Sequence, residues 1–165
     1  AIDITRTVLG RFLNLIISSA LYENDAKKLR NKRELYFKIH DILRDLLSIN
    51  NDFSVYATLE ATQKTAPTNP RFEKTLKENI GNSYCRQYAY ELMDTIFKRE
   101  ASIIFDWMER GKSAADIPEM NAEKSKIFEN YIKTPLATLA PKEKACAKET
   151  LRSAKELLEL VPDVL

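Results

Sequence analysis

The sequence predicts an all-α protein, an irregular multi-helix bundle with one long central helix. Apolar residues recur at helical spacing along most of the 165 residues, and no stretch alternates as a half-buried strand does. Only three glycines are present, which leaves few tight turns and favours long regular elements. We expect a single domain, residues 1–165, because this length is enough to bury a substantial core.

The first half of the chain is expected to hold four helices. Asp3 or Thr5 can cap the first, because a short side-chain oxygen accepts from unpaired first-turn N–H groups. Gly10 lies inside that helix, where it either costs about 1 kcal/mol or allows another helix to approach closely. Pro70 suits the first position of the fourth helix, and Gly81 suits a left-handed closing residue. The predicted ranges are about Asp3–Tyr22, Asp25–Ser48, Ser54–Lys64 and Pro70–Ile80.

The second half is expected to begin with the longest element, a helix over Asn82–Gly111 that Gly111 closes. A connection over Lys112–Pro118 follows it. Pro135 should separate the last two helices, because proline cannot continue a helix. Their predicted ranges are about Asn121–Ile132 and Pro141–Leu160.

Apolar side chains cover most of the circumference of helix 82–111. When residues are placed at 100° intervals, one narrow polar sector is left, which holds Gln87, Glu91, Asp94, Lys98 and Glu109. A surface helix shows an apolar arc of only about 100° or somewhat more. This helix is therefore expected to be central, or to keep a face for something outside the chain. Arg99, Glu100 and Asp106 interrupt the apolar arc. Either they form ion pairs at helix contacts, or Glu100 or Asp106 lines a pocket.

The residues show no catalytic or metal-binding motif. The single histidine, His40, cannot supply the two Glu-x-x-His elements of a di-metal bundle, and with the distant Cys85 and Cys146 it makes a poor zinc site. We expect His40 to be a surface or cap-adjacent residue. The cysteines are expected to be buried free thiols, with one disulfide as the alternative. No cofactor is predicted, and three glycines leave no glycine-rich phosphate loop.

Charge and hydropathy give no case for nucleic acid or membrane as a partner. The net charge is +2, and the basic cluster Lys27–Arg33 is flanked by Asp25 and Glu34, so we expect it to be a solvated helix face. No run of about 18 apolar residues is present to span a bilayer. The apolar-rich stretch Leu13–Leu21 lacks the basic leader of a signal peptide.

Several short motifs follow one another in a characteristic order. They are Asp3-Ile4-Thr5-Arg6, Ile42–Leu47 with Asn51-Asp52-Phe53, Leu59-Glu60-Ala61, Tyr84-Cys85-Arg86-Gln87 through to Phe105, and Asp116-Ile117-Pro118. This order resembles the all-helical C-terminal domain of the α-N-acetylglucosaminidase family of glycoside hydrolases. That domain typically opens on an Asp-aliphatic-Thr-Arg helix and carries a long helix with a Tyr-Ala-Asn-Arg/Lys-Gln motif. The resemblance covers nearly the whole chain.

The chain departs from the family pattern in two places. Before the long helix the family usually carries an Asn-x-Arg element and a Thr-x-Trp-Gly turn, but residues 72–83 hold neither that Arg nor a Trp. Late in the long helix, Arg99-Glu100-Ala101 stands where the family usually has Pro-Arg-Trp. In the family, the catalytic carboxylates lie on a separate (β/α)8 barrel. No catalytic residue is therefore carried over to this chain.

The resemblance implies a helical accessory domain, a fragment of a longer glycoside hydrolase, that packs on the barrel and shapes the substrate cleft. A start at Ala1 without Met fits this expectation. The implied partners are the barrel and carbohydrate, in a secreted, periplasmic or lysosomal protein. The candidate cleft or interface residues are Tyr84, Tyr88, Arg99, Glu100, Asp106 and Trp107. The alternative is a stand-alone α-helical protein-interaction module that binds through a helix groove or by dimerising.

Overall fold

The computed structural model describes residues 2–65, 71–82 and 88–161, and no strand occurs among them, as the sequence predicts. The longer helices are α1 (Ile2–Leu21), α2 (Ala26–Ser48), α3 (Val55–Thr65), α4 (Phe72–Asn82), α6 (Lys98–Glu109), α7 (Ile117–Lys133) and α9 (Ala147–Leu160). The short elements are the 3₁₀ turns η1 (Asn51–Phe53) and η3 (Ala114–Asp116), the helices α5 (Tyr90–Leu92) and α8 (Leu136–Leu139), and the π-helical segment η2 (Met93–Phe97). The segments α5, η2 and α6 run on without a break, and we call residues 90–109 the central helix.

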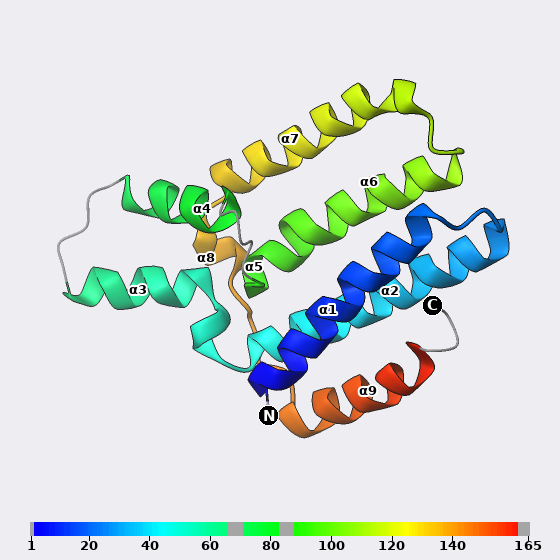
Figure 1. Cartoon of the computed structure of the whole chain (residues 1–165). Coiled ribbons are helices and arrows are strands. Elements are labelled where there is room, and N and C mark those ends of the chain that lie inside the picture. Colours follow the sequence, from blue (N-terminus) through cyan, green and yellow to red (C-terminus); the bar gives the residue numbers. More distant parts are fainter. Residues whose placement is uncertain (1, 66–70, 83–87, 162–165) are drawn as a thin grey trace.

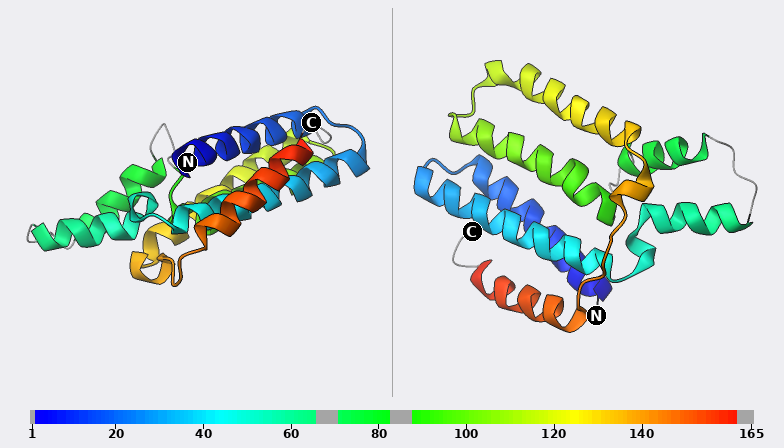
Figure 2. Two further views of the ribbon diagram at one scale, coloured as in Figure 1. Left: turned by 90° about the horizontal axis from the view of Figure 1, so that it is seen from below. Right: turned by 180° about the vertical axis from the view of Figure 1, so that it is seen from behind.

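The helices form one main layer with two additions. The helices α7, α6, α2 and α9 lie side by side, and α1 lies along α2 on one face of this layer (Figures 1 and 2). The helices α3 and α4 project from one end of the layer, where α8 and the end of α7 contact them. The fold therefore places α1 and α6 near one another, and α2 packs against both of them.

Two hydrophobic cores follow from this arrangement. The larger core joins α1, α2, α6 and α9, and its fully buried members include Leu9, Ile39 and Phe105. The smaller core joins α3, α4, α5, α7 and α8 around Leu92 and Tyr131. The central helix contributes to both, with Met93 in the larger core and Leu92 in the smaller.

The first two helices form an antiparallel pair. Asp25 ends the turn between them and caps α2, because its Oδ1 accepts from the backbone N–H groups of Lys27 at 2.8 Å and Lys28 at 2.9 Å. Of the helices that the structure describes, α1 alone is long and apolar enough to cross a membrane by length and composition. Core helices of soluble proteins and N-terminal signal sequences meet the same description. Leu9 and Leu13 of α1 are packed in the larger core, and 28% of its apolar stretch is buried.

The central helix is shorter than the predicted helix 82–111 but is central, as predicted. It begins at Tyr90 because Ala89 is extended, with φ −122° and ψ 147°, whereas residues 83–87 lie outside the described part of the chain. The helix α2 packs along one side of it and α7 along the other. Most of its wide apolar arc is therefore used inside the bundle rather than kept for an outside partner.

A π-helical turn interrupts the central helix where His40 meets it. The Met93 carbonyl accepts from the Lys98 N–H, an i to i+5 bond, and also from His40 Nε2 at 3.0 Å. A side chain that inserts into the backbone ladder is a recognised cause of such a bulge. The prediction of a surface or cap-adjacent His40 is wrong, because its side chain is 0% exposed.

Glu91 lies in the predicted polar sector, but it is buried at 2% exposure. Its carboxylate accepts from Ser54 Oγ at 2.5 Å and from the backbone N–H groups of Val55 at 2.9 Å and Tyr56 at 3.0 Å. These are unpaired donors at the start of α3. One helix therefore caps another, which spacing along the sequence cannot reveal.

The three glycines serve different purposes. Gly111 ends the central helix with φ +100°, as predicted. Gly81 was expected to close a helix, but it lies inside α4, where an added Cβ would be 2.7 Å from Cε2 of Phe128. At Gly10, a Cβ would be 2.6 Å from Cε2 of Tyr88, so the close approach is by one ring and not by a helix.

The C-terminal boundaries differ from the prediction. The helix α7 starts at Ile117 rather than near Asn121, with Pro118 in its first turn, where a missing N–H is tolerated. Residues 141–146 are not helical, so α9 starts at Ala147. Cys146 was expected to be buried, but it is exposed and free, and Cys85 lies outside the described residues.

We expect Gly81→Ala to lower the free energy of unfolding by about 1 to 2 kcal/mol, because overpacking a well-filled contact typically costs about 1–3 kcal/mol. Helix propensity alone predicts a gain of about 1 kcal/mol. Urea denaturation measures the difference. In a Phe128→Leu background the same change should be neutral or stabilising, and an equal loss in both backgrounds would contradict this explanation.

We expect Glu91→Gln to destabilise the fold by about 2–3 kcal/mol. An amide has one acceptor oxygen, whereas the two oxygens of the Glu91 carboxylate accept from three donors. Thermal unfolding gives the loss, and hydrogen exchange of the Val55 and Tyr56 amides should accelerate with it. The matched control is Glu60→Gln, an exposed carboxylate that bonds only to Tyr56 Oη, with an effect within about 0.5 kcal/mol. Unchanged exchange at Val55 would show that Glu91 is not the cap.

Candidate functional site

The structure does not bring the six predicted cleft residues together. Tyr88 and Glu100 line one cavity, and Tyr84 lies outside the described residues. Asp106 pairs with Arg33 at 2.6 Å, and Trp107 Nε1 donates to the Ser113 carbonyl at 2.8 Å. Arg99 is exposed. For Asp106 the ion-pair interpretation is confirmed, and Glu100 contributes to the lining of a cavity.

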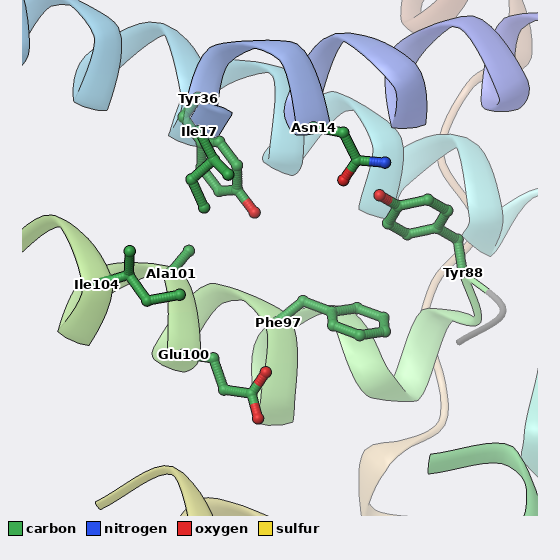
Figure 3. Close-up of a pocket in the computed structure, with 8 residues that line it drawn as sticks. All are labelled: Asn14, Ile17, Tyr36, Tyr88, Phe97, Glu100, Ala101 and Ile104. Atoms are coloured by element: carbon green, nitrogen blue, oxygen red, sulfur yellow. The ribbon is translucent and has the colours of Figure 1, made fainter. Parts of the chain in front are cut away.

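We call the space between α1, α2 and α6 the central cavity. It has a volume of about 320 Å³ (Figure 3). Three aromatic residues, three aliphatic residues and two polar residues line it: Tyr36, Tyr88 and Phe97; Ile17, Ala101 and Ile104; and Asn14 and Glu100. Such a mixture of apolar walls and a few polar groups is typical of small-molecule sites.

Two tyrosines place hydroxyl groups in the central cavity. Tyr36 comes from α2 and points its hydroxyl into the space between α1 and α6, whereas Tyr88 points its hydroxyl toward Asn14 (Figure 3). Tyr88 Oη donates to the Gly10 carbonyl at 3.4 Å. Burial raises the pKa of Tyr36 well above its ordinary value, and the neighbouring Tyr88 and Glu100 raise that pKa further. The Tyr36 hydroxyl therefore stays protonated at physiological pH and can donate a hydrogen bond.

A second cavity lies where α1, η1 and the residues before α5 meet, and we call it the motif hollow. Its volume is about 540 Å³, and it is lined by Asp3 and Arg6 of α1, Asp52, Phe53, Ser54, Val55 and Thr58 around the start of α3, and Ile80, Tyr88 and Ala89. Arg6 Nη2 lies 3.1 Å from Asp3 Oδ1, and its guanidinium carbon lies 4.9 Å from the centre of the Phe53 ring. Arg6 Nε is buried without a hydrogen-bond partner among the described residues. The hollow is therefore lined by a cation that keeps one donor unused.

A histidine and two carboxylates also lie close together. One ligand atom each from His40, Asp41 and Asp94 fall within 4.8 Å of one another. However, Lys98 Nζ lies 2.6 Å from Asp41 Oδ1, and Arg44 Nη1 lies 3.2 Å from Asp94 Oδ2. Partial burial opposes ionisation of Asp41, but the Lys98 hydrogen bond lowers the pKa of Asp41 below its ordinary value. Both carboxylates are thus neutralised by side chains, and we interpret the cluster as an ion-pair network.

Sequence reasoning missed four buried charged or polar residues: His40, Glu91, Lys77 and Lys32. Lys32 belongs to the basic cluster that was expected to be a solvated helix face, but it is 4% exposed and its Nζ lies 3.3 Å from Glu23 Oε2. His40 and Glu91 bond to remote backbone groups, as described above. Lys77 of α4 is 2% exposed, and its Nζ donates to the carbonyls of Ile132 and Thr134 at 2.6 Å each, which caps the end of α7. Charged residues are almost never fully buried unless paired. A lysine at a core position of an amphipathic helix is the one signal that would have singled out Lys77.

Comparisons with protein-family models, with curated proteins and with solved structures found no match to this chain.

We expect the free energy of unfolding to fall as the pH decreases from about 7 to about 5.5. Burial lowers the pKa of His40 below its ordinary value of 6.5, so the unfolded chain binds this proton more readily than the folded chain. Stability is therefore full above the unfolded pKa and is lost below it, by at most about 1.4 kcal/mol per pH unit for one group. Chemical denaturation across this range measures the slope.

The control is His40→Gln, whose amide can still donate to the Met93 carbonyl but does not titrate. Because His40 is the only histidine in the chain, this variant should lose the slope. An equal slope in both proteins would mean that another group is responsible.

Proposed function

We propose that the chain is a helical accessory domain of an α-N-acetylglucosaminidase-like glycoside hydrolase. It would pack on a catalytic barrel that this chain does not contain and help to shape the substrate cleft. In this proposal, carboxylates of the barrel carry out the hydrolysis. No residue between 1 and 165 is assigned a catalytic role.

The motif hollow is the observation that carries the proposal. The motifs of the resemblance are far apart in the sequence, yet Asp3 and Arg6 of the first one meet Asp52 and Phe53 of the second at this hollow. Tyr88, which directly follows the Tyr84–Gln87 motif, lines the same hollow. Residues that serve one purpose are expected to gather at one place, and the first two motifs bring the Arg6 guanidinium and the Phe53 ring together here.

An exposed apolar stripe on α1 gives the proposal a docking surface. Ile4 is 71% exposed, Leu15 is 52% exposed, and Tyr22, directly after the helix, is 85% exposed. Ile4 and Leu15 are 11 residues apart and lie on one face of α1, with the exposed Arg11 between them, and Tyr22 lies just beyond the end of the helix. Large exposed apolar side chains on one side of a helix favour a covered face, and Ile4 is next to Asp3 at the motif hollow.

The same stripe favours one alternative, a stand-alone α-helical module that binds a protein partner. In that case α1 would be the interaction surface, and the motif hollow would have no connection to catalysis. The two functions differ in what the parent gene encodes and in whether Arg6 affects hydrolysis.

We expect the parent reading frame to encode a (β/α)8 barrel and the full-length protein to hydrolyse an aryl α-N-acetylglucosaminide. Arg6→Ala in that protein should lower kcat/KM by about 10- to 100-fold, because misplaced cleft walls cost rate through substrate positioning. The matched control is Arg152→Ala, an exposed arginine of α9 that lines neither hollow and does not belong to α1, which should retain full activity.

Two results would overturn the proposal. One is a reading frame that holds only these helices, which would select the interaction module. The other is turnover of the aryl glycoside by residues 1–165 alone above a heat-killed control, which would place an active site in this chain.

A further inference from the structure

We propose that the central cavity is a binding site for a small, uncharged, flat molecule that carries an oxygen acceptor. The site is distinct from the motif hollow, and it does not depend on the accessory-domain function. Its floor is the Tyr36 hydroxyl, its walls are apolar, and its rim carries the Asn14 amide.

The Tyr36 hydroxyl is the group that points to a ligand. The side chain is only 7% exposed, and edge contacts with Phe37 and Phe105, each with ring centres 5.5 Å apart, hold the ring. The hydroxyl makes no hydrogen bond to any residue that the structure describes, and it points into the cavity (Figure 3). The hydroxyl is not one of the buried atoms that lack a hydrogen-bond partner, so it reaches the open space of the cavity, where an acceptor can take its hydrogen bond in place of water.

The walls select a flat apolar body. Tyr88 and Phe97 form an edge-to-face pair with ring centres 5.6 Å apart, and Ile17 and Ile104 line the same space from α1 and α6. Aromatic and aliphatic surfaces of this kind pack best against another ring. The volume of about 320 Å³ is near the lower end of small-molecule sites, which span roughly 300–1,000 Å³.

The charge around the cavity selects against an anion. Glu100 contributes its side chain to the lining, with its carboxylate turned toward α7, and it is close enough to raise the pKa of Tyr36. None of the described residues that line the cavity is a lysine or an arginine, so an anion bound there would find no counter-charge in the lining. Asn14 is exposed at the rim and offers both donors and an acceptor to the polar end of a neutral ligand.

Benzamide is a suitable probe, because it combines a ring, a carbonyl acceptor and amide donors without charge. We expect its titration into ¹⁵N-labelled protein to give saturable shifts at the backbone amides of Ile17, Ala101 and Ile104. Tyr36→Phe should weaken binding by about five- to tenfold, the loss of one neutral hydrogen bond. The matched control is Tyr22→Phe, which removes the same atom from a tyrosine that is 85% exposed, and its affinity should be unchanged.

Benzoate serves as the charged control and should bind at least tenfold more weakly than benzamide. A second variant, Asn14→Trp, fills the rim from an exposed position and should abolish the shifts even if Tyr36→Phe fails to fold. The proposal is overturned if benzamide gives no saturable shift at the lining amides, because water alone would then satisfy Tyr36. It is equally overturned if folded Tyr36→Phe binds as well as the wild type, or if benzoate binds as tightly as benzamide.

Discussion

A buried carboxylate on the central helix is the interaction on which the junction of the two cores depends. Glu91 takes the unpaired N–H groups of Val55 and Tyr56 and the hydroxyl of Ser54, so it caps α3 from outside that helix. A negative charge at a helix start is stabilised by those donors and by the helix dipole. Because Glu91 belongs to the helix that also packs against α2 and α7, the cap positions α3 relative to the main layer.

The irregular start of the central helix creates the two hollows. Ala89 is extended and the π-helical turn at Met93 follows Glu91, with His40 bonded to the widened turn. Tyr88 is thus held beside α1, with its ring against Gly10, and it lines both the central cavity and the motif hollow. Departures from regular geometry of this kind are concentrated at functional sites more often than elsewhere.

The two hollows differ in chemistry, and this supports separate uses. The motif hollow is lined by the Arg6 guanidinium and by the carboxylates of Asp3 and Asp52, so it is polar and charged. The central cavity presents aromatic rings and a protonated hydroxyl, which suit a small neutral molecule. The wide apolar arc of the central helix, which predicted either a central position or an outside partner, is mostly packed inside the bundle. Among the described residues, four of the six large apolar side chains that are exposed lie on α1 or directly after it, so α1 is the face that the accessory-domain proposal concerns.

Sequence alone determined the all-α class, the start of α2 at Asp25, the stop at Gly111 and the central place of the long helix. Those features depend on side chains within about four positions of one another, or on the breadth of one apolar arc. Of the residues that line the central cavity, the sequence singled out Tyr88 and Glu100. Tyr36 appears in the sequence only as one member of the apolar pattern of α2. Only the tertiary structure decided that His40, Glu91 and Lys77 are buried. It also decided that position 81 requires a glycine, because the Phe128 ring approaches it. A buried polar group is stable only where a remote segment supplies its partner, and a glycine is required only where a remote ring approaches. Neither partner is encoded near the residue that needs it.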